Sequence, residues 1–137
     1  MTENFEESLG VNSRLQLAEA ESILKHRKNV ELMTAGVTII DPDNTYVAPE
    51  VTVGSDTILH PGTVLEGNTV IGENCEIGPH TRLTNVTVGN NTVIHFTYGH
   101  DCEVKDGVDI GPYVHLRPNT VIGNKVHIGN FVEVKNS

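Results

Sequence analysis

The stretch VKDGVDIGPYVHLRPNTVIGNKVHIGNFVEV, residues 104–134, places an aliphatic residue at every sixth position. The same spacing runs through residues 53–83. The region between the two series departs from it and has Tyr98 and Gly99 where an aliphatic is expected, which a shortened corner would explain. A period of six fits neither an α-helix nor a lone alternating strand, so it predicts a higher-order repeat. The two series are Val53, Leu59, Leu65, Ile71, Ile77 and Leu83, and then Val104, Ile110, Leu116, Ile122, Ile128 and Val134. The sequence therefore predicts a solenoid.

Each six-residue unit suits one flat side of a parallel β-helix, in which a short strand is followed by a corner. Gly or a short polar residue often follows the aliphatic, and Gly tolerates the unusual backbone angles of a corner. Three units close a triangular coil of about 18 residues, so residues 18 apart are expected to stack about 4.8 Å from each other. The expected fold class is an all-β solenoid.

The segment before the repeats has a different composition. Residues 13–34 contain Leu, Ala, Glu, Lys and Arg without Gly or Pro, which favours a helix. Ser13 and Gln16 form the capping-box pattern at its start, and the residues before them are expected to be poorly ordered. We expect an N-terminal tail and linker helix over residues 1–36 and a β-helix over residues 37–137. The last repeat is incomplete, so the β-helix is expected to be truncated at its C-terminal end.

Charge and composition narrow the possible partners. Nine basic and eighteen acidic residues give a net charge of −9, which argues against nucleic acid or an anionic membrane as a general partner. No apolar run approaches membrane-spanning length, and the first ten residues are acidic, unlike a signal peptide. The expected location is therefore the cytoplasm. Cys75 and Cys102 lie a coil and a half apart, so they are expected to be free thiols.

Two basic residues form the first candidate site. Arg117 and Lys135 are 18 residues apart, so they are expected to stack on consecutive coils, each directly after a core aliphatic. Like charges in this arrangement repel each other. An outside anion would stabilise the pair, and Arg is suited to phosphate or carboxylate. Alternatively, the two side chains splay apart into solvent, and the spacing leaves both arrangements open.

Two further patterns concern possible metal ligands. Asn12 directly precedes the expected helix cap and could offer its side-chain oxygen to a hard cation or a sugar, although a turn residue is common there. His60 precedes His95 and His100 by about two coils. Three imidazoles on neighbouring coils or facing subunits could bind zinc, whereas solvated surface histidines are the simpler interpretation.

Four segments carry a resemblance to a known family. They are GVNSRLQLA (10–18), AGVTIIDP (35–42), GPYVHLRP (111–118) and HIGNFVEVKNS (127–137). In this order they closely resemble the bacterial bifunctional N-acetylglucosamine-1-phosphate uridyltransferase / glucosamine-1-phosphate acetyltransferase family. Hexapeptide repeats alone occur in many acyltransferases, whereas the first and last segments are specific to this enzyme family.

The resemblance implies more than the repeats do. It implies a left-handed parallel β-helix that assembles as a homotrimer and is joined by a helix to a nucleotidyltransferase domain. Asn12 matches an asparagine that helps to hold Mg²⁺ and the uridine-diphosphate sugar. Arg117 and Lys135 match the basic pair that binds the phosphate of the amino sugar. In the family, acetyl-coenzyme A acetylates glucosamine 1-phosphate and UTP then supplies the uridyl group, which makes UDP-N-acetylglucosamine for peptidoglycan of the cell wall.

The chain also departs from the family pattern. It contains no Gly-rich nucleotide loop, so the uridyltransferase domain is expected to be absent. The family's catalytic His, which acts as a general base, would lie beyond residue 137, so the chain alone is expected to be inactive. Two other functions stay open. One is a trimeric hexapeptide scaffold without catalysis, and the other is a carbonic-anhydrase-like zinc protein that uses His60, His95 and His100.

Overall fold

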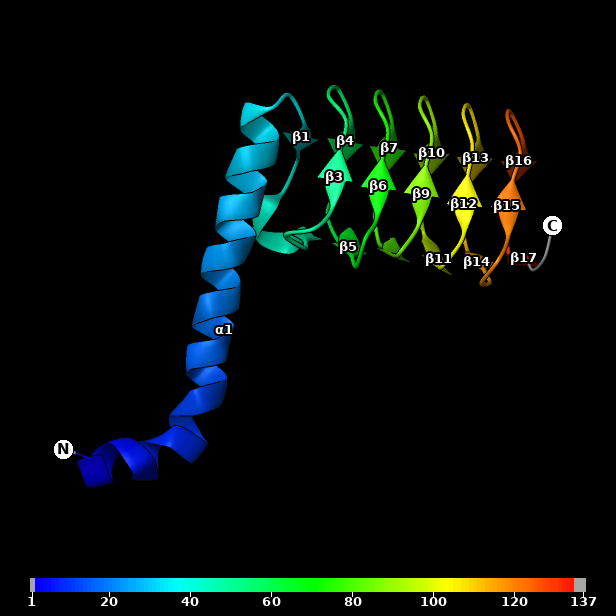
Figure 1. The fold of residues 1–137 in the computed structure, drawn as a ribbon. Helices are drawn as coiled ribbons and strands as arrows, with labels where there is room; N and C mark the ends of the chain where they lie inside the picture. Colours follow the sequence, from blue (N-terminus) through cyan, green and yellow to red (C-terminus); the bar gives the residue numbers. More distant parts are fainter. Residues whose placement is uncertain (1, 135–137) are drawn as a thin grey trace.

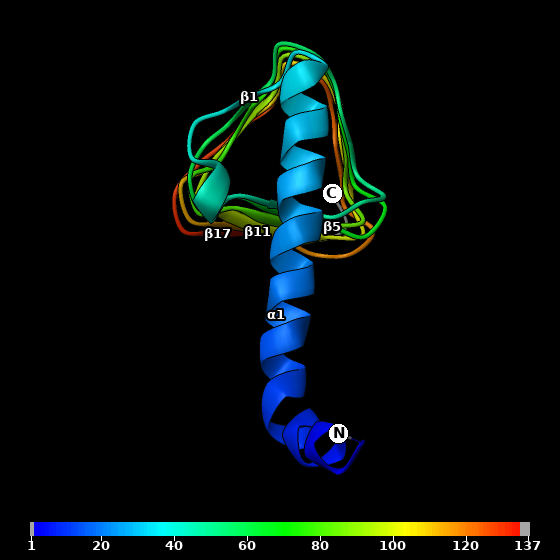
Figure 2. The ribbon, with the colours of Figure 1, turned by 90° about the vertical axis from the view of Figure 1, so that its left-hand side faces the viewer.

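The computed structural model describes the backbone of residues 2–134 and the side chains of residues 13–134. Its N-terminal helix, α1 (Thr2–Thr34), is followed by short strands in three parallel sheets. Figure 1 shows the coils stacked one after another, and the view along the stack in Figure 2 shows that they enclose a triangular prism. The predicted solenoid with an N-terminal helical arm is confirmed.

Each sheet takes one strand from each coil. The first sheet contains β1 (Thr38–Ile39), β4 (Ile58–Leu59), β7 (Glu76–Ile77), β10 (Val93–Ile94), β13 (Asp109–Ile110) and β16 (His127–Ile128). The second contains β2 (Tyr46–Val47), β5 (Val64–Glu66), β8 (Arg82–Thr84), β11 (Thr97–His100), β14 (Val114–Leu116) and β17 (Val132–Val134). The third contains β3 (Thr52–Val53), β6 (Val70–Ile71), β9 (Thr87–Val88), β12 (Glu103–Val104) and β15 (Val121–Ile122). A short 3-10 helix, η1 (Pro42–Asn44), connects β1 to β2.

The register explains the break in the hexapeptide spacing. In the second sheet Leu65 pairs with Leu83, which lies 18 residues later, as the repeat predicts. Leu83 then pairs with Gly99 and Gly99 with Leu116, at separations of 16 and 17 residues. The middle coils are therefore shortened between strands, and the ladder continues through them. Gly99 occupies the core position where an aliphatic residue was expected.

The core is a stack of aliphatic side chains with small residues beside them. Leu59, Leu65, Ile77 and Leu83 are fully buried. The small residues are often threonines, whose hydroxyls would be costly to bury without partners. Thr57 illustrates the solution, since its Oγ1 donates a hydrogen bond to the carbonyl oxygen of Gly72 at 2.8 Å. Cys75 and Cys102 are buried free thiols, as expected, and burial raises the pKa of both.

The start of α1 corrects the prediction from the capping-box pattern. The helix begins at Thr2, so Ser13 lies inside it and does not cap it, and the helix includes the residues that were expected to form a tail. The residues before Ser13 contain no proline, and their glutamates favour a helix N-terminus. Figure 1 shows that the helix changes direction in its dark-blue N-terminal part. Among the described residues, no helix has the length and apolar character needed to cross a membrane.

The last turns of α1 dock on the first coil through polar side chains. Asn29 Nδ2 donates to the carbonyl oxygens of Pro42 and Thr45, and Lys28 Nζ donates to that of Pro49. Together with the buried Leu32, they cover the open end of the solenoid. Four apolar side chains of α1 are exposed in the single chain, namely Leu17, Leu24, Val30 and Met33. The helix therefore covers the first coil with a face that does not include them.

Candidate functional site

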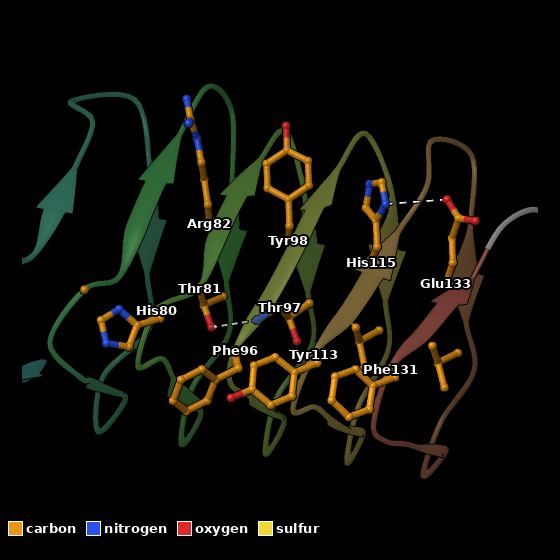
Figure 3. A pocket seen from close by; sticks show the side chains of 13 residues that line it. His80, Thr81, Arg82, Phe96, Thr97, Tyr98, Tyr113, His115, Phe131 and Glu133 are labelled. Atoms are coloured by element: carbon orange, nitrogen blue, oxygen red, sulfur yellow. Dashed lines mark hydrogen bonds and ion pairs between the residues drawn. The ribbon is translucent and has the colours of Figure 1, made fainter.

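A groove of about 750 Å³ lies along the second sheet and crosses several coils. Figure 3 shows that it runs between two rows of side chains, one on a corner and one on the strands. Thr81 and Thr97 lie between the two rows, and Val114 and Val132 also line the groove. The repeat produces both rows, because equivalent positions of successive coils stack in register.

We call the first row the aromatic corner: His80, Phe96, Tyr113 and Phe131. Their rings follow one another at centroid distances of 5.5 Å, 5.5 Å and 5.0 Å. The last pair, Tyr113 and Phe131, is nearly parallel, with an interplanar angle of 8°. Phe131 is 79% exposed, so the corner presents an open aromatic surface at its C-terminal end.

The residue types at the aromatic corner are unusual for its backbone conformation. All four residues have a positive φ, between 48° and 62°. His tolerates this left-handed region better than most residues, whereas Phe and Tyr are rare there and cost about 1 kcal/mol or more each. Many other corners with a positive φ carry the better suited Asn or Asp, as at Asn74, Asn91 and Asn119. Phe96, Tyr113 and Phe131 therefore occupy this corner at a local cost, which favours a role in binding.

The second row is on the strands and is polar. Arg82, Tyr98, His115 and Glu133 are directly opposite one another in the register of β8, β11, β14 and β17. Tyr98 packs on His115, with ring centroids 5.3 Å apart. Glu66, on the preceding coil, binds Arg82 Nε at 2.7 Å and raises the pKa of the Arg82 guanidinium. The row offers one cation, two aromatic groups and one carboxylate to the groove.

Arg117 lies at the end of β14, directly after the core residue Leu116, as the sequence predicts. Its backbone N–H donates to the carbonyl oxygen of Val134 at 2.8 Å, and its side chain is 46% exposed. Its Nη1 lies 3.1 Å from Glu133 Oε2. The anion beside Arg117 is therefore a carboxylate of the same chain. Sequence reasoning missed Glu133, because the residue before a core aliphatic is usually an ordinary surface position.

The other two predicted binding residues are not placed by the structure. Leu116 pairs with Val134, 18 residues later, and Lys135 follows Val134 but lies outside the described residues. The stacking of Lys135 on Arg117 therefore stays a prediction. Asn12 belongs to α1, and its side chain is outside the described part of the chain.

The three histidines of the zinc hypothesis are separated in a single chain. His60 follows β4 in the first sheet and contacts Glu76 at 2.9 Å. His95 follows β10 in that sheet, whereas His100 belongs to β11 in the second sheet and contacts Asp101 at 3.1 Å. Within the part of the chain that the structure describes, no group of three His, Cys, Asp or Glu could hold a metal ion. The arrangement with zinc within one subunit is therefore not supported.

Sequence comparisons connect this chain with bifunctional enzymes. The sequence model of the GMPPB C-terminal domain family matches residues 42–137. The protein called bifunctional protein GlmU from Geobacillus sp. (strain WCH70) is 52% identical over 134 residues, and that from Halalkalibacterium halodurans is 50% identical over 136 residues. These alignments cover 98% and 99% of the chain, but 29% and 30% of the relatives. The chain thus spans under a third of the length of these relatives.

A solved structure confirms the fold class. The N-acyltransferase AntD from Bacillus cereus, in complex with dTDP and 3-hydroxybutyryl-CoA, aligns with a TM-score of 0.62. The alignment covers 80% of this chain and 78% of that chain, at 19% sequence identity. At this identity the similarity shows the fold alone.

Proposed function

The chain belongs to the GMPPB C-terminal domain family and matches bifunctional GlmU proteins along almost its whole length, and on this premise we propose that it forms part of a glucosamine-1-phosphate acetyltransferase site. The complete enzyme would then transfer an acetyl group from acetyl-coenzyme A, followed by uridyl transfer from UTP to give UDP-N-acetylglucosamine. In this proposal residues 1–36 are the linker and residues 37–137 belong to the acetyltransferase region, in the cytoplasm.

The single observation that carries the proposal is the position of Arg117. It stands half-exposed at the end of β14, on the sheet that bears the groove, and its counter-ion Glu133 is itself half-exposed. An Arg with an exchangeable counter-ion suits a phosphate group, because guanidinium N–H groups can donate two parallel hydrogen bonds. Lys135, one position after Val134, would supply the second positive charge. In a chain of net charge −9, such a site is local rather than a result of overall charge.

Two further ligands are proposed from the family relationship alone. Acetyl-coenzyme A would be the co-substrate of the acetyltransferase region. Mg²⁺ would belong to the uridyltransferase site, where Asn12 would contribute one amide oxygen, a ligand type that hard cations accept. The described residues offer no cluster of carboxylates to complete such a site, so the remaining ligands would come from outside them. Acetyl transfer needs a general base to take a proton from the sugar amine, and we propose that this base is not in the chain.

We also propose that the chain forms a homotrimer through the aromatic corner. Phe131 and Tyr113 expose apolar rings, and exposed apolar patches often mark protein interfaces. Copies of a chain with a net charge of −9 repel each other in general, whereas phenylalanine and tyrosine rings carry no charge. A rotation axis parallel to the solenoid would bring the same coil of each copy together, so the uncharged rings would meet one another.

A binding experiment with matched variants tests the proposed function. The chain is titrated with glucosamine 1-phosphate by calorimetry, and acetyl transfer from acetyl-coenzyme A is measured in parallel. We expect weak binding that Arg117→Ala abolishes and no turnover. Lys105→Ala is the matched control, because Lys105 also follows a core aliphatic, Val104, and has its own carboxylate partner, Glu103, but does not line the groove.

Three outcomes would contradict parts of this proposal. An equal loss of binding in Arg117→Ala and Lys105→Ala would indicate general charge attraction rather than a site. A trimer without any affinity for the sugar phosphate would favour the scaffold function. Turnover by the chain would mean that a general base for the reaction lies among residues 1–137.

A further inference from the structure

One carboxylate oxygen of Glu133 lies close to two different side chains. Its Oε2 is 3.1 Å from Arg117 Nη1 and 3.5 Å from His115 Nδ1. Glu133 is paired with His115 across β14 and β17. Arg117 comes two residues after His115, just past the end of β14. Figure 3 shows the carboxylate of Glu133 directed toward the His115 ring. A small movement of the Glu133 side chain would therefore exchange one partner for the other.

The contact between Glu133 and Arg117 is easily replaced. Both side chains are 46% exposed, and ion pairs exposed to this degree contribute little to stability because water screens them. A phosphate monoester brings more negative charge and more acceptor oxygens than a carboxylate, and it can accept two hydrogen bonds from one guanidinium. A phosphate group that reaches Arg117 would compete with Glu133 for it.

His115 is held where it can receive Glu133. Its ring lies 5.3 Å from that of Tyr98 and stacks on that of His100 at 6.5 Å. The His115 Nε2 atom is buried and has no hydrogen-bond partner among the described residues. The Glu133 carboxylate can only accept a hydrogen bond, so its contact with His115 requires a hydrogen on Nδ1, the nitrogen that faces Glu133.

We propose that Glu133 is an internal counter-anion of Arg117, which the phosphate of the ligand displaces toward His115. This inference rests on the proposed function, in which Arg117 binds the phosphate of glucosamine 1-phosphate. Glu133 lowers the affinity of Arg117 for phosphate, and His115 reduces that effect by giving the carboxylate another partner. Both are positioning residues, since they act on the ligand through Arg117.

The test uses calorimetric titration of the chain with glucosamine 1-phosphate. Glu133→Gln keeps the shape of the side chain and an acceptor oxygen but removes the charge, so we expect the affinity to rise about two- to fivefold. Glu66→Gln is the matched control, because it removes the same charge from the Arg82 contact on the same sheet, and we expect no change.

A second pair of variants isolates His115. His115→Phe retains a ring beside Tyr98 but removes the donor, so Glu133 stays with Arg117 and the affinity falls. In the double variant with Glu133→Gln, this loss disappears, and the affinity equals that of Glu133→Gln alone. A merely structural effect of His115→Phe would persist in the double variant. Circular dichroism confirms that each variant is folded.

The outcomes separate this inference from the proposed function. Binding that depends on Arg117 but is unchanged or weakened by Glu133→Gln overturns the role of Glu133 and leaves the proposed function intact. An equal rise in affinity in Glu66→Gln also overturns the role of Glu133. Removal of any carboxylate charge on this sheet would then be enough to raise the affinity for phosphate. Absence of binding by both the unaltered chain and Glu133→Gln, or binding that is independent of Arg117, overturns both proposals.

Discussion

Asn29 donates a hydrogen bond from its Nδ2 to the carbonyl oxygen of Thr45 at 3.3 Å, and this contact joins α1 to the first coil of the solenoid. The Asn29 side chain is almost completely buried, at 1% exposure. The open end of a parallel sheet presents unpaired backbone groups, and the polar side chains of α1 provide partners for some of them.

Replacement of Asn29 with Leu is expected to destabilise the chain. It removes the donor to the Pro42 and Thr45 carbonyl oxygens, and loss of partners for buried polar groups costs about 1–3 kcal/mol. The free energy of unfolding from urea denaturation measures the effect. Ser22→Ala changes an exposed position of the same helix and should stay within about 0.5 kcal/mol of the unaltered chain. Equal stability of Asn29→Leu would show that apolar contact alone docks the helix.

Gly99 supplies a second prediction, on core packing. A Cβ atom at this position would lie 3.2 Å from Leu116 Cβ and 3.5 Å from Leu83 Cδ2. Gly99→Val therefore overfills the core, and overpacking of this kind costs about 1–3 kcal/mol. The midpoint of urea unfolding should fall, whereas Thr52→Val on the exposed side of β3 should leave it nearly unchanged. A stabilised Gly99→Val variant would mean that the leucines move apart easily.

Gly99 also marks how far the sequence predicts the fold. The six-residue spacing predicts the solenoid and its pairing, because each aliphatic needs the same environment on every coil. The interval around Tyr98 and Gly99 predicts a shortened corner. It does not predict that Leu83 and Leu116 fill the space above Gly99, because that contact depends on the path of two coils in three dimensions.

The candidate site was predicted only in part, for a similar reason. Arg117 was identified because a charged residue directly after a core aliphatic is unusual. Glu133 looks like any outward residue of a strand, and only the register of β14 with β17 places it beside His115 and Arg117. The aromatic corner was missed because Phe and Tyr are not expected at a positive φ.

Cys102 supplies a prediction on pH dependence. Burial, assisted by the nearby Asp101 carboxylate, raises the pKa of its thiol from 9.0 to about 11. The unfolded chain therefore loses this proton at lower pH than the folded chain, so the stability that the neutral thiol contributes is lost between about pH 9 and pH 11. The difference in unfolding free energy between the chain and Cys102→Ala should shrink over that range. A constant difference would show that Cys102 ionises alike in both states.

The same burial predicts slow reaction of Cys102 and Cys75 with a disulfide reagent at pH 8. The thiolate is the reactive form, and both cysteines are buried with raised pKa values. Both thiols should react only after denaturation, as followed by absorbance. Thr87→Cys adds a thiol at an exposed position of β9 and should react at once, which gives the reference rate. Rapid reaction of the unaltered chain would indicate frequent opening of the coils.

The aromatic corner predicts how the chain associates. Tyr113→Ser combined with Phe131→Ser removes two exposed rings of the corner, so self-association should weaken by tenfold or more. Buried aromatic residues contribute about 2 kcal/mol or more at interface hot spots. Sedimentation equilibrium measures the association constant. Val70→Ser combined with Val121→Ser removes exposed apolar side chains from the third sheet instead and should leave association unchanged. If that control weakens association as much as the corner variant does, the association does not depend on the aromatic corner specifically. The rings of the corner would then bind another ligand.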